Sequence, residues 1–270
     1  MRMPNRLAAN TSSYMPYRLE EALAGIAAAG YRFVEVAAIR GVIEHVPLDA
    51  DAKTVGRVQR LLNDHALTPV ALSAHSNLTA ARGVRDAYRG LDLCARLGIP
   101  IMNTAVGGPE DRHPEDEAAF LRNIGGLAEY AAERDVTITL EIHGELTATG
   151  RKSRELIEKV NRPNVRINYD TANCEYFGGV RAEDDLPYAL PCVALSHLKD
   201  KVGGLRVWNF PALGRGHVDF GKLLRMLRRG GYTGPYSVEI EFKGHPWPPL
   251  DVVDRAMRAS YKYLNRFGLC

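Results

Sequence analysis

The segment Leu19-Glu20-Glu21-Ala22-Leu23-Ala24-Gly25-Ile26 places its apolar residues on one face of a helix, and Phe33-Val34-Glu35-Val36 follows as a short apolar run rich in β-formers. Gly30, between the two, is typical of the residue that ends a helix. An earlier apolar run, Arg6-Leu7-Ala8-Ala9-Asn10, precedes the helix. A strand, a helix and a strand in this order predict two parallel strands joined by a helical crossover.

The same alternation continues to the end of the chain. Further β-rich runs begin at Val70, Ile101, Thr137, Val165, Val193 and Tyr236. Helical spacing occupies residues 51–65, 80–97, 115–134, 151–160, 183–190, 218–230 and 250–266. Together they make eight strand–helix units in 270 residues, which predict an α/β fold with a single (β/α)8 TIM barrel domain over residues 1–270. An open doubly wound sheet is less consistent with the sequence, because no Gly-x-Gly-x-x-Gly turn follows the first strand.

The composition is that of an ordinary globular protein, with 46% hydrophobic and 25% charged residues. The 35 basic and 32 acidic residues give a formal net charge of +3 with no Lys/Arg block, which offers no argument for nucleic acid or anionic membrane as a partner. No stretch approaches the roughly 20 apolar residues of a membrane span, and the first ten residues lack the apolar core of a signal peptide. We therefore expect a cytoplasmic protein.

Ionisable residues end many of the predicted strands, which in barrel enzymes is where the site is built. Glu141, Asp170, His197 and Glu239 occupy equivalent ends of four consecutive strands. One such residue is more often a solvated loop residue or a helix cap, but four at matching ends favour a common function. Glu241 has the same strand parity as Glu239 and is the competitor for the fourth position.

Three carboxylates and one imidazole in a partly buried pocket require a compensating cation, because desolvation and repulsion would otherwise protonate them. The four side chains therefore predict a site for one divalent metal ion. Oxygen-rich ligation with one nitrogen favours Mn2+, with Mg2+, Co2+ and Zn2+ as alternatives.

At these positions the chain resembles the xylose isomerase-like TIM barrels of the sugar phosphate isomerase/epimerase family, and the resemblance covers its whole length. The motifs that carry it are Thr139-Leu140-Glu141-Ile142-His143, Asn168-Tyr169-Asp170-Thr171-Ala172-Asn173, Ser196-His197-Leu198-Lys199-Asp200, Leu213-Gly214-Arg215-Gly216-His217-Val218-Asp219-Phe220 and Gly231-Tyr232-Thr233-Gly234-Pro235-Tyr236-Ser237-Val238-Glu239. The resemblance implies that Glu141, Asp170, His197 and Glu239 are the metal ligands and that Glu141 and Glu239 act as acid and base. It also implies an isomerase or epimerase that acts on a keto-sugar or polyol-derived ketone, by proton abstraction next to a metal-bound carbonyl.

One position departs from the family pattern. Members of the family often have His three residues after the aspartate, where this chain has Asn173. Asn can hydrogen-bond a substrate but cannot shuttle a proton near pH 7, which leaves His75, His143 and Lys199 as candidates for a second acid or a substrate anchor. Among these His143 is preferred as a catalytic residue, because it shares strand parity with Glu141.

Two further candidates for substrate binding are Glu35, on the second predicted strand, and Arg206, in the long irregular stretch from Lys201 to Gly216. A connection of this length usually forms a lid, a binding loop or an oligomer contact. Trp208 and Phe210 in the same stretch could lie over a sugar or could contact a second copy in a dimer or tetramer.

Three other functions remain open at this point. A lyase, such as an inosose-type dehydratase or a β-eliminating enzyme of an oxidised glycoside, would begin with the same proton abstraction. An AP endonuclease of the same family would need a basic stripe and more metal ligands, and this near-neutral chain with Asn173 argues against it. A non-catalytic sugar-binding barrel would not need the four metal ligands. For the isomerase, epimerase and lyase functions, the expected partner is a small carbohydrate.

Overall fold

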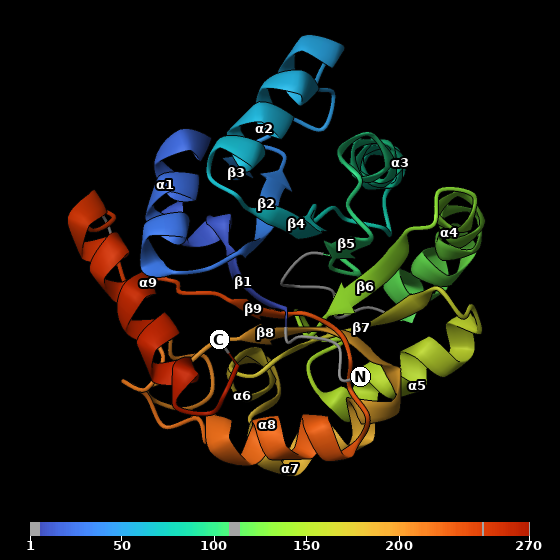
Figure 1. Cartoon of the computed structure of the whole chain (residues 1–270). Coiled ribbons are helices and arrows are strands. Elements are labelled where there is room, and N and C mark those ends of the chain that lie inside the picture. The colour runs from blue at the N-terminus through green and yellow to red at the C-terminus, as the bar shows by residue number, and fades with distance from the viewer. Residues whose placement is uncertain (1–5, 108–113, 245, 270) are drawn as a thin grey trace.

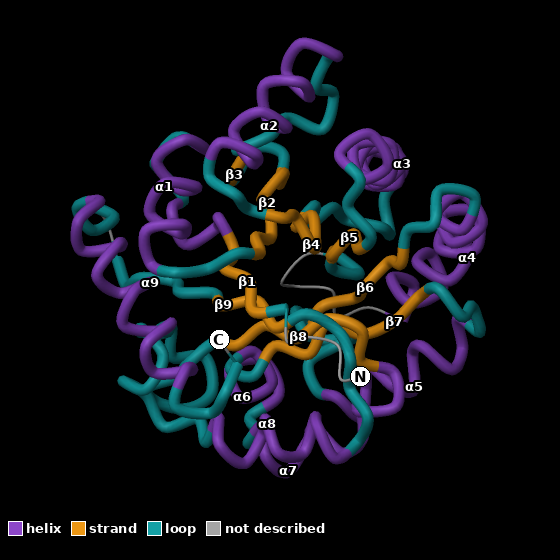
Figure 2. The backbone as a smooth tube through the Cα atoms, in the orientation of Figure 1, coloured by secondary structure: helices purple, strands orange, loops and turns teal. Residues whose placement is uncertain are grey.

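The computed structural model describes residues 6–107, 114–244 and 246–269. Parallel strands form a barrel and helices surround it, as Figure 1 and Figure 2 show. The barrel strands are β1 (Leu7–Asn10), β2 (Phe33–Ile39), β4 (Thr68–Ser73), β5 (Ile101–Thr104), β6 (Thr137–Glu141), β7 (Val165–Asp170), β8 (Val193–Leu198) and β9 (Tyr236–Val238). Their order is β1-β9-β8-β7-β6-β5-β4-β2, and a further pairing of β1 with β2 closes the barrel. The predicted (β/α)8 barrel is confirmed.

The helices lie where the spacing of apolar residues predicts them, within about two residues at each end. They are α1 (Leu19–Ala29), α2 (Ala52–Asp64), α3 (Ala81–Leu97), α4 (Pro114–Ala132), α5 (Gly150–Val160), α7 (Ala182–Ala189), α8 (Phe220–Arg229) and α9 (Leu250–Asn265). Gly30 ends α1 with a φ of 113°, a left-handed conformation that a side chain would strain.

Four short elements are absent from the sequence prediction. They are β3 (Ile43–Glu44), α6 (Asn173–Gly178) and the 3-10 turns Thr11–Tyr14 and Leu190–Cys192. The two residues of β3 pair antiparallel with the end of β2, and α6 follows β7 directly. Elements this short do not span enough residues for a periodic pattern to appear.

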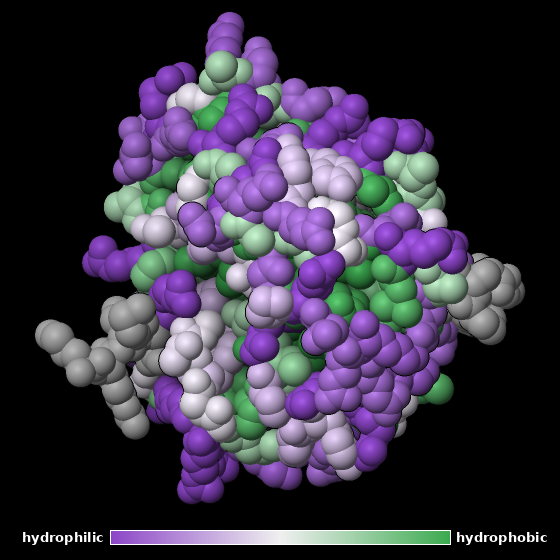
Figure 3. Space-filling view, turned by 90° about the vertical axis from the view of Figure 1, so that its right-hand side faces the viewer, coloured by the Kyte–Doolittle hydropathy of each residue, from purple (hydrophilic) through white to green (hydrophobic). Residues whose placement is uncertain are grey.

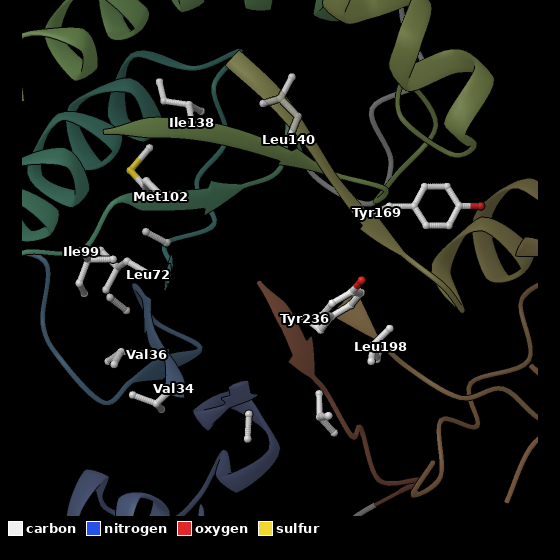
Figure 4. Close-up of a cluster of buried hydrophobic side chains, with 14 of the residues drawn as sticks. Val34, Val36, Leu72, Ile99, Met102, Ile138, Leu140, Tyr169, Leu198 and Tyr236 are labelled. Carbon is white, nitrogen blue, oxygen red and sulfur yellow. The ribbon is translucent and has the colours of Figure 1, made fainter. Parts of the chain in front are cut away.

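The main hydrophobic core lies between the barrel and its helices. On β6, Ile138 and Leu140 belong to this core (Figure 4). Thr139 and Glu141 alternate with them and face the barrel interior. The interior has its own small apolar cluster of Ala71, Ile101 and Leu195.

The interior becomes polar toward the carboxyl ends of the strands. Two residues beyond each member of the apolar cluster stand Ser73, Asn103 and His197, all buried. Alternation therefore directs polar side chains into the barrel at one end, and a site can form there.

Hydrophilic residues dominate the outer surface around α4, with smaller hydrophobic patches between them (Figure 3). Of the helices in the described ranges, none has both the length and the apolar character needed to cross a membrane.

Candidate active site

The four predicted ligands meet at one end of the barrel. Glu141, Asp170, His197 and Glu239 are buried, and each offers a ligand atom within 4.8 Å of the others. The Nδ1 atom of His197 lies 3.4 Å from Glu141 Oε2, 3.8 Å from Asp170 Oδ2 and 3.4 Å from Glu239 Oε2. Ligands on opposite sides of a small divalent ion lie roughly 4.4 Å apart, so the cluster has the dimensions of a site for one ion.

Two of the ligand atoms are buried without a hydrogen-bond partner among the described residues, namely Asp170 Oδ2 and His197 Nδ1. The opposite atom of each side chain is fixed. Asp170 Oδ1 accepts the backbone N–H groups of Ala172 and Asn173, both at 2.8 Å. His197 Nε2 lies 2.9 Å from Glu35 Oε2, a contact that favours the proton on Nε2 of a neutral imidazole and would leave the Nδ1 lone pair for a metal ion. These residues therefore fit a divalent metal ion.

The electrostatics of the cluster also fit a cation. Although burial alone would lower the pKa of His197, the carboxylates of Glu35, Glu141 and Glu239 raise it well above its usual value. Burial raises the pKa of Asp170 despite the nearby ammonium group of Lys199. Without another positive charge, the cluster therefore attracts protons to its own ligand atoms, and a divalent ion would compensate the same negative charge.

The Glu141 carboxylate is held by three amides and one imidazole. Its Oε2 atom accepts hydrogen bonds from Nδ2 of Asn103 at 2.7 Å and from Nδ2 of Asn168 at 3.2 Å, and it lies 3.1 Å from His75 Nε2. Its Oε1 atom accepts Nδ2 of Asn173 at 3.1 Å. His75 and Asn173, both predicted to bind substrate, thus contact the carboxylate that is predicted to act as acid or base.

The Glu239 carboxylate is held in a similar way. Its Oε1 atom accepts Nδ2 of Asn10 at 3.0 Å and Oγ of Ser12 at 2.8 Å, while Lys199 Nζ lies 3.1 Å from Oε2. Lys199 also forms an ion pair with Glu241 at 2.5 Å. Lys199 thus pairs with both glutamates, and of the two it is Glu239 that lies in the cluster of four.

Two of the remaining candidates lie behind this first layer of side chains. The His143 ring lies 5.8 Å from the His75 ring and 4.8 Å from the Phe177 ring, measured between centroids. Burial lowers the pKa of His143 to about 4, so that its imidazole is neutral near pH 7. Glu35, which is fully buried, contacts His197 and so orients a predicted metal ligand.

Arg206 lies at the edge of the site. Its guanidinium group pairs with Glu145, and its Cζ atom lies 5.2 Å from the centroid of the Phe177 ring. Arg206 therefore joins the loop after β8 to the loop after β6.

The long loop after β8 is anchored by two buried charged residues. Lys201 Nζ donates to the backbone carbonyls of Val202, Gly203 and Val207. The Asp200 carboxylate accepts backbone N–H groups from Lys201, Gly214, Arg215, Gly216 and Val218. Because both ends of the loop are held, the segment that carries Arg206 and Trp208 has a defined position at the barrel mouth.

We expect Asp200→Asn to lower the free energy of unfolding by about 3 kcal/mol, since the amide turns a donor toward backbone N–H groups that the carboxylate accepts. Urea denaturation of the variant and of Asp64→Asn, an exposed position on α2, measures the difference. Equal stability of the two variants would contradict the anchoring role of Asp200.

Comparison with known proteins establishes the family. A family model described as xylose isomerase-like TIM barrel matches residues 23–263. The chain belongs to this family, which confirms the resemblance seen in the sequence motifs, and it is an enzyme.

Two of the relatives that are similar in sequence are 3-epimerases. An L-ribulose 3-epimerase from Methylomonas sp. (strain DH-1) is 27% identical over 242 residues, which cover 81% of this chain and 77% of the relative. A ketose 3-epimerase from Arthrobacter globiformis is 28% identical over 222 residues, which cover 73% of this chain and 72% of the relative.

Solved structures share the fold. A D-allulose 3-epimerase from Methylomonas sp. in complex with D-allulose superposes with a TM-score of 0.77 at 20% identity, over 98% of this chain and 99% of that one. A probable 3-DHS dehydratase, AsbF, from Bacillus anthracis superposes with a TM-score of 0.74 at 18% identity, over 96% of this chain and 98% of that one.

Proposed function

We propose that this enzyme is a divalent-metal-dependent epimerase that inverts the carbon next to the carbonyl group of a keto-sugar. The observation that carries the proposal is the cluster of Glu141, Asp170, His197 and Glu239, with two buried ligand atoms that lack a hydrogen-bond partner among the described residues. The sequence relatives, which are a ribulose and a ketose 3-epimerase, support the same reaction class.

In this proposal the four clustered residues hold the ion, with Mn2+ as the preferred metal because of the oxygen-rich ligand set. A bound divalent cation would polarise the substrate carbonyl and thereby acidify the neighbouring C–H bond. Of the four neighbouring strands β6, β7, β8 and β9, Glu141 ends the first and Glu239 follows the last, so that one can remove a proton and the other can return one.

The partners of the two glutamates keep them anionic. Burial alone would raise the pKa of Glu141, but His197 and His75 lower it below its usual value. Burial would likewise raise the pKa of Glu239, but Lys199 and His197 lower it well below its usual value. Each carboxylate can therefore begin the reaction as a base.

The other candidate residues take supporting roles in the same proposal. His75, Asn173 and Lys199 contact the acid–base carboxylates and would bind substrate hydroxyl groups. Neutral His143 would support the His75 ring, Arg206 would contact substrate from the loop, and Glu35 would act through His197. A cytoplasmic location and assembly into a dimer or tetramer stay predictions.

A lyase is the second candidate, because the fold is shared with a probable dehydratase and because loss of water would start with the same proton abstraction. The product separates the two functions. We would incubate the Mn2+-loaded enzyme with ketopentoses, ketohexoses and inososes and follow the reaction by NMR. Inversion of the carbon next to the carbonyl supports the epimerase, whereas an unsaturated product that has lost water would replace it with the lyase.

We expect Glu35→Gln to weaken metal affinity by roughly 10- to 100-fold, the usual effect of losing the carboxylate behind a ligating histidine. Titration with Mn2+ followed by calorimetry gives the dissociation constant. Glu133→Gln, on an exposed carboxylate, is the matched control. An unchanged affinity in Glu35→Gln would show that the pair with His197 does not support metal binding.

A further inference from the structure

A cavity of about 510 Å3 lies beside the proposed catalytic centre. Its lining residues are Met15, Val207, Trp208, Phe242, Lys243, Gly244 and Trp247. They come from the segments that follow β1, β8 and β9, three adjacent strands of the barrel. We call this cavity the aromatic groove; it lies at the end of the barrel that carries the four clustered residues.

A short series of contacts connects the aromatic groove to the catalytic centre. Lys199, which pairs with Glu239, places its Nζ atom 4.5 Å from the centroid of the Phe210 ring. The Phe210 ring in turn lies 5.1 Å from the ring of Trp208, in an edge-to-face arrangement. A backbone bridge between Phe210 and Glu241 holds the loop after β8 against the segment after β9. The groove therefore lies next to the centre, with the Phe210 side chain between them, and a ligand that extends past Phe210 would enter the groove.

The groove has the chemistry of a sugar-binding surface. Trp208 is 46% exposed although it is a large apolar residue, while Phe210 behind it is 1% exposed and supports it. Trp247 is fixed by its indole N–H, which donates to the Ser13 carbonyl at 3.3 Å, and its ring lies 5.5 Å from that of Phe242. Rigid aromatic rings next to one polar group suit the apolar C–H face of a sugar ring.

The lining is less suited to a phosphate group, since Lys243 is the one cationic residue among the lining residues given above and no arginine accompanies it. The four clustered residues do not line the groove, so a single ring held at the centre would leave the groove unfilled.

We infer that the aromatic groove is a subsite for a second sugar ring and that the enzyme prefers a glycosylated keto-sugar to a free monosaccharide. The inference rests on the proposed epimerase function, because it places the reacting ketose at the cluster of four. The glycosyl group would extend from the end of the ketose opposite the reacting carbons and lie against Trp208 and Trp247.

Binding can be tested without turnover, because the chain has two tryptophans and both line the groove. Intrinsic tryptophan fluorescence should change when isomaltulose, a fructose with a glucosyl group on O6, is titrated, and should change far less with fructose. The catalytically impaired Glu239→Gln variant should give the same difference. Equal responses to the two sugars would overturn the subsite, whereas a failure of both to react would count only against the epimerase function.

Kinetics test the same inference through a ratio. The ratio of kcat/KM for isomaltulose to that for fructose should fall about tenfold in Trp208→Ala, the scale of one lost aromatic contact. It should stay unchanged in Leu205→Ala, a 56% exposed apolar residue of the same loop outside the groove. Two results would overturn the inference: an unchanged ratio in Trp208→Ala, or a loss of oligomer mass in that variant, which would assign the groove to a second copy of the chain.

Discussion

Glu239→Gln is expected to lower kcat by about 100-fold or more, the contribution of a positioned general base. The substitution keeps the size of the side chain and can keep a carbonyl oxygen toward Asn10 and Ser12. It removes the charge that faces the cluster, so the variant can neither accept the substrate proton nor contribute a full charge to metal binding. Steady-state kinetics with saturating Mn2+ measure the loss.

Glu241→Gln is the matched control, because Glu241 has the same strand parity but pairs with Lys199 outside the cluster of four. It should lose much less activity than Glu239→Gln. If Glu241→Gln loses the larger part of kcat, the assignment of the base on this strand is wrong.

Removal of divalent ions is expected to lower activity by at least as large a factor as Glu239→Gln. One ligand atom each of buried Asp170 and His197 has no hydrogen-bond partner among the described residues, so chelation would leave the cluster with uncompensated negative charge. Activity should fall by at least about 100-fold and return when Mn2+ is added, and a saturating ion at 100 times its dissociation constant should stabilise the fold by about 2.7 kcal/mol.

Elemental analysis, activity and urea denaturation of the chelated and reloaded protein measure these effects. His197→Ala should show neither tight metal binding nor the gain in stability. Full activity in a preparation free of divalent ions would remove the metal from the mechanism.

The fold could be predicted from the sequence because every barrel strand is buried on both faces and every helix has one apolar face. Segments such as Phe33–Val36 and Leu19–Ile26 repeat these two patterns along the chain. The cluster of four followed from the fold, since the carboxyl ends of neighbouring parallel strands meet at one end of a barrel.

The rest of the site could not be predicted in the same way. Asn10, Asn103 and Asn168, whose amides hold the two glutamates, are not ionisable and so do not belong to the pattern of charged residues at strand ends. Buried amides at the ends of apolar strands were the available signal. The contact of Glu35 with His197 joins residues 162 positions apart, and no local pattern encodes such a pairing.

The most direct test of the account is solvent exchange at the substrate carbon next to the carbonyl group. With the Mn2+-loaded enzyme and its keto-sugar in heavy water, NMR should show deuterium at that carbon in the product. Glu141→Gln and Glu239→Gln should each slow the incorporation by about 100-fold. The contradicting result is product formation at the normal rate with no deuterium in product or recovered substrate. It would exclude a mechanism in which a carboxylate removes the proton and then exchanges it with solvent.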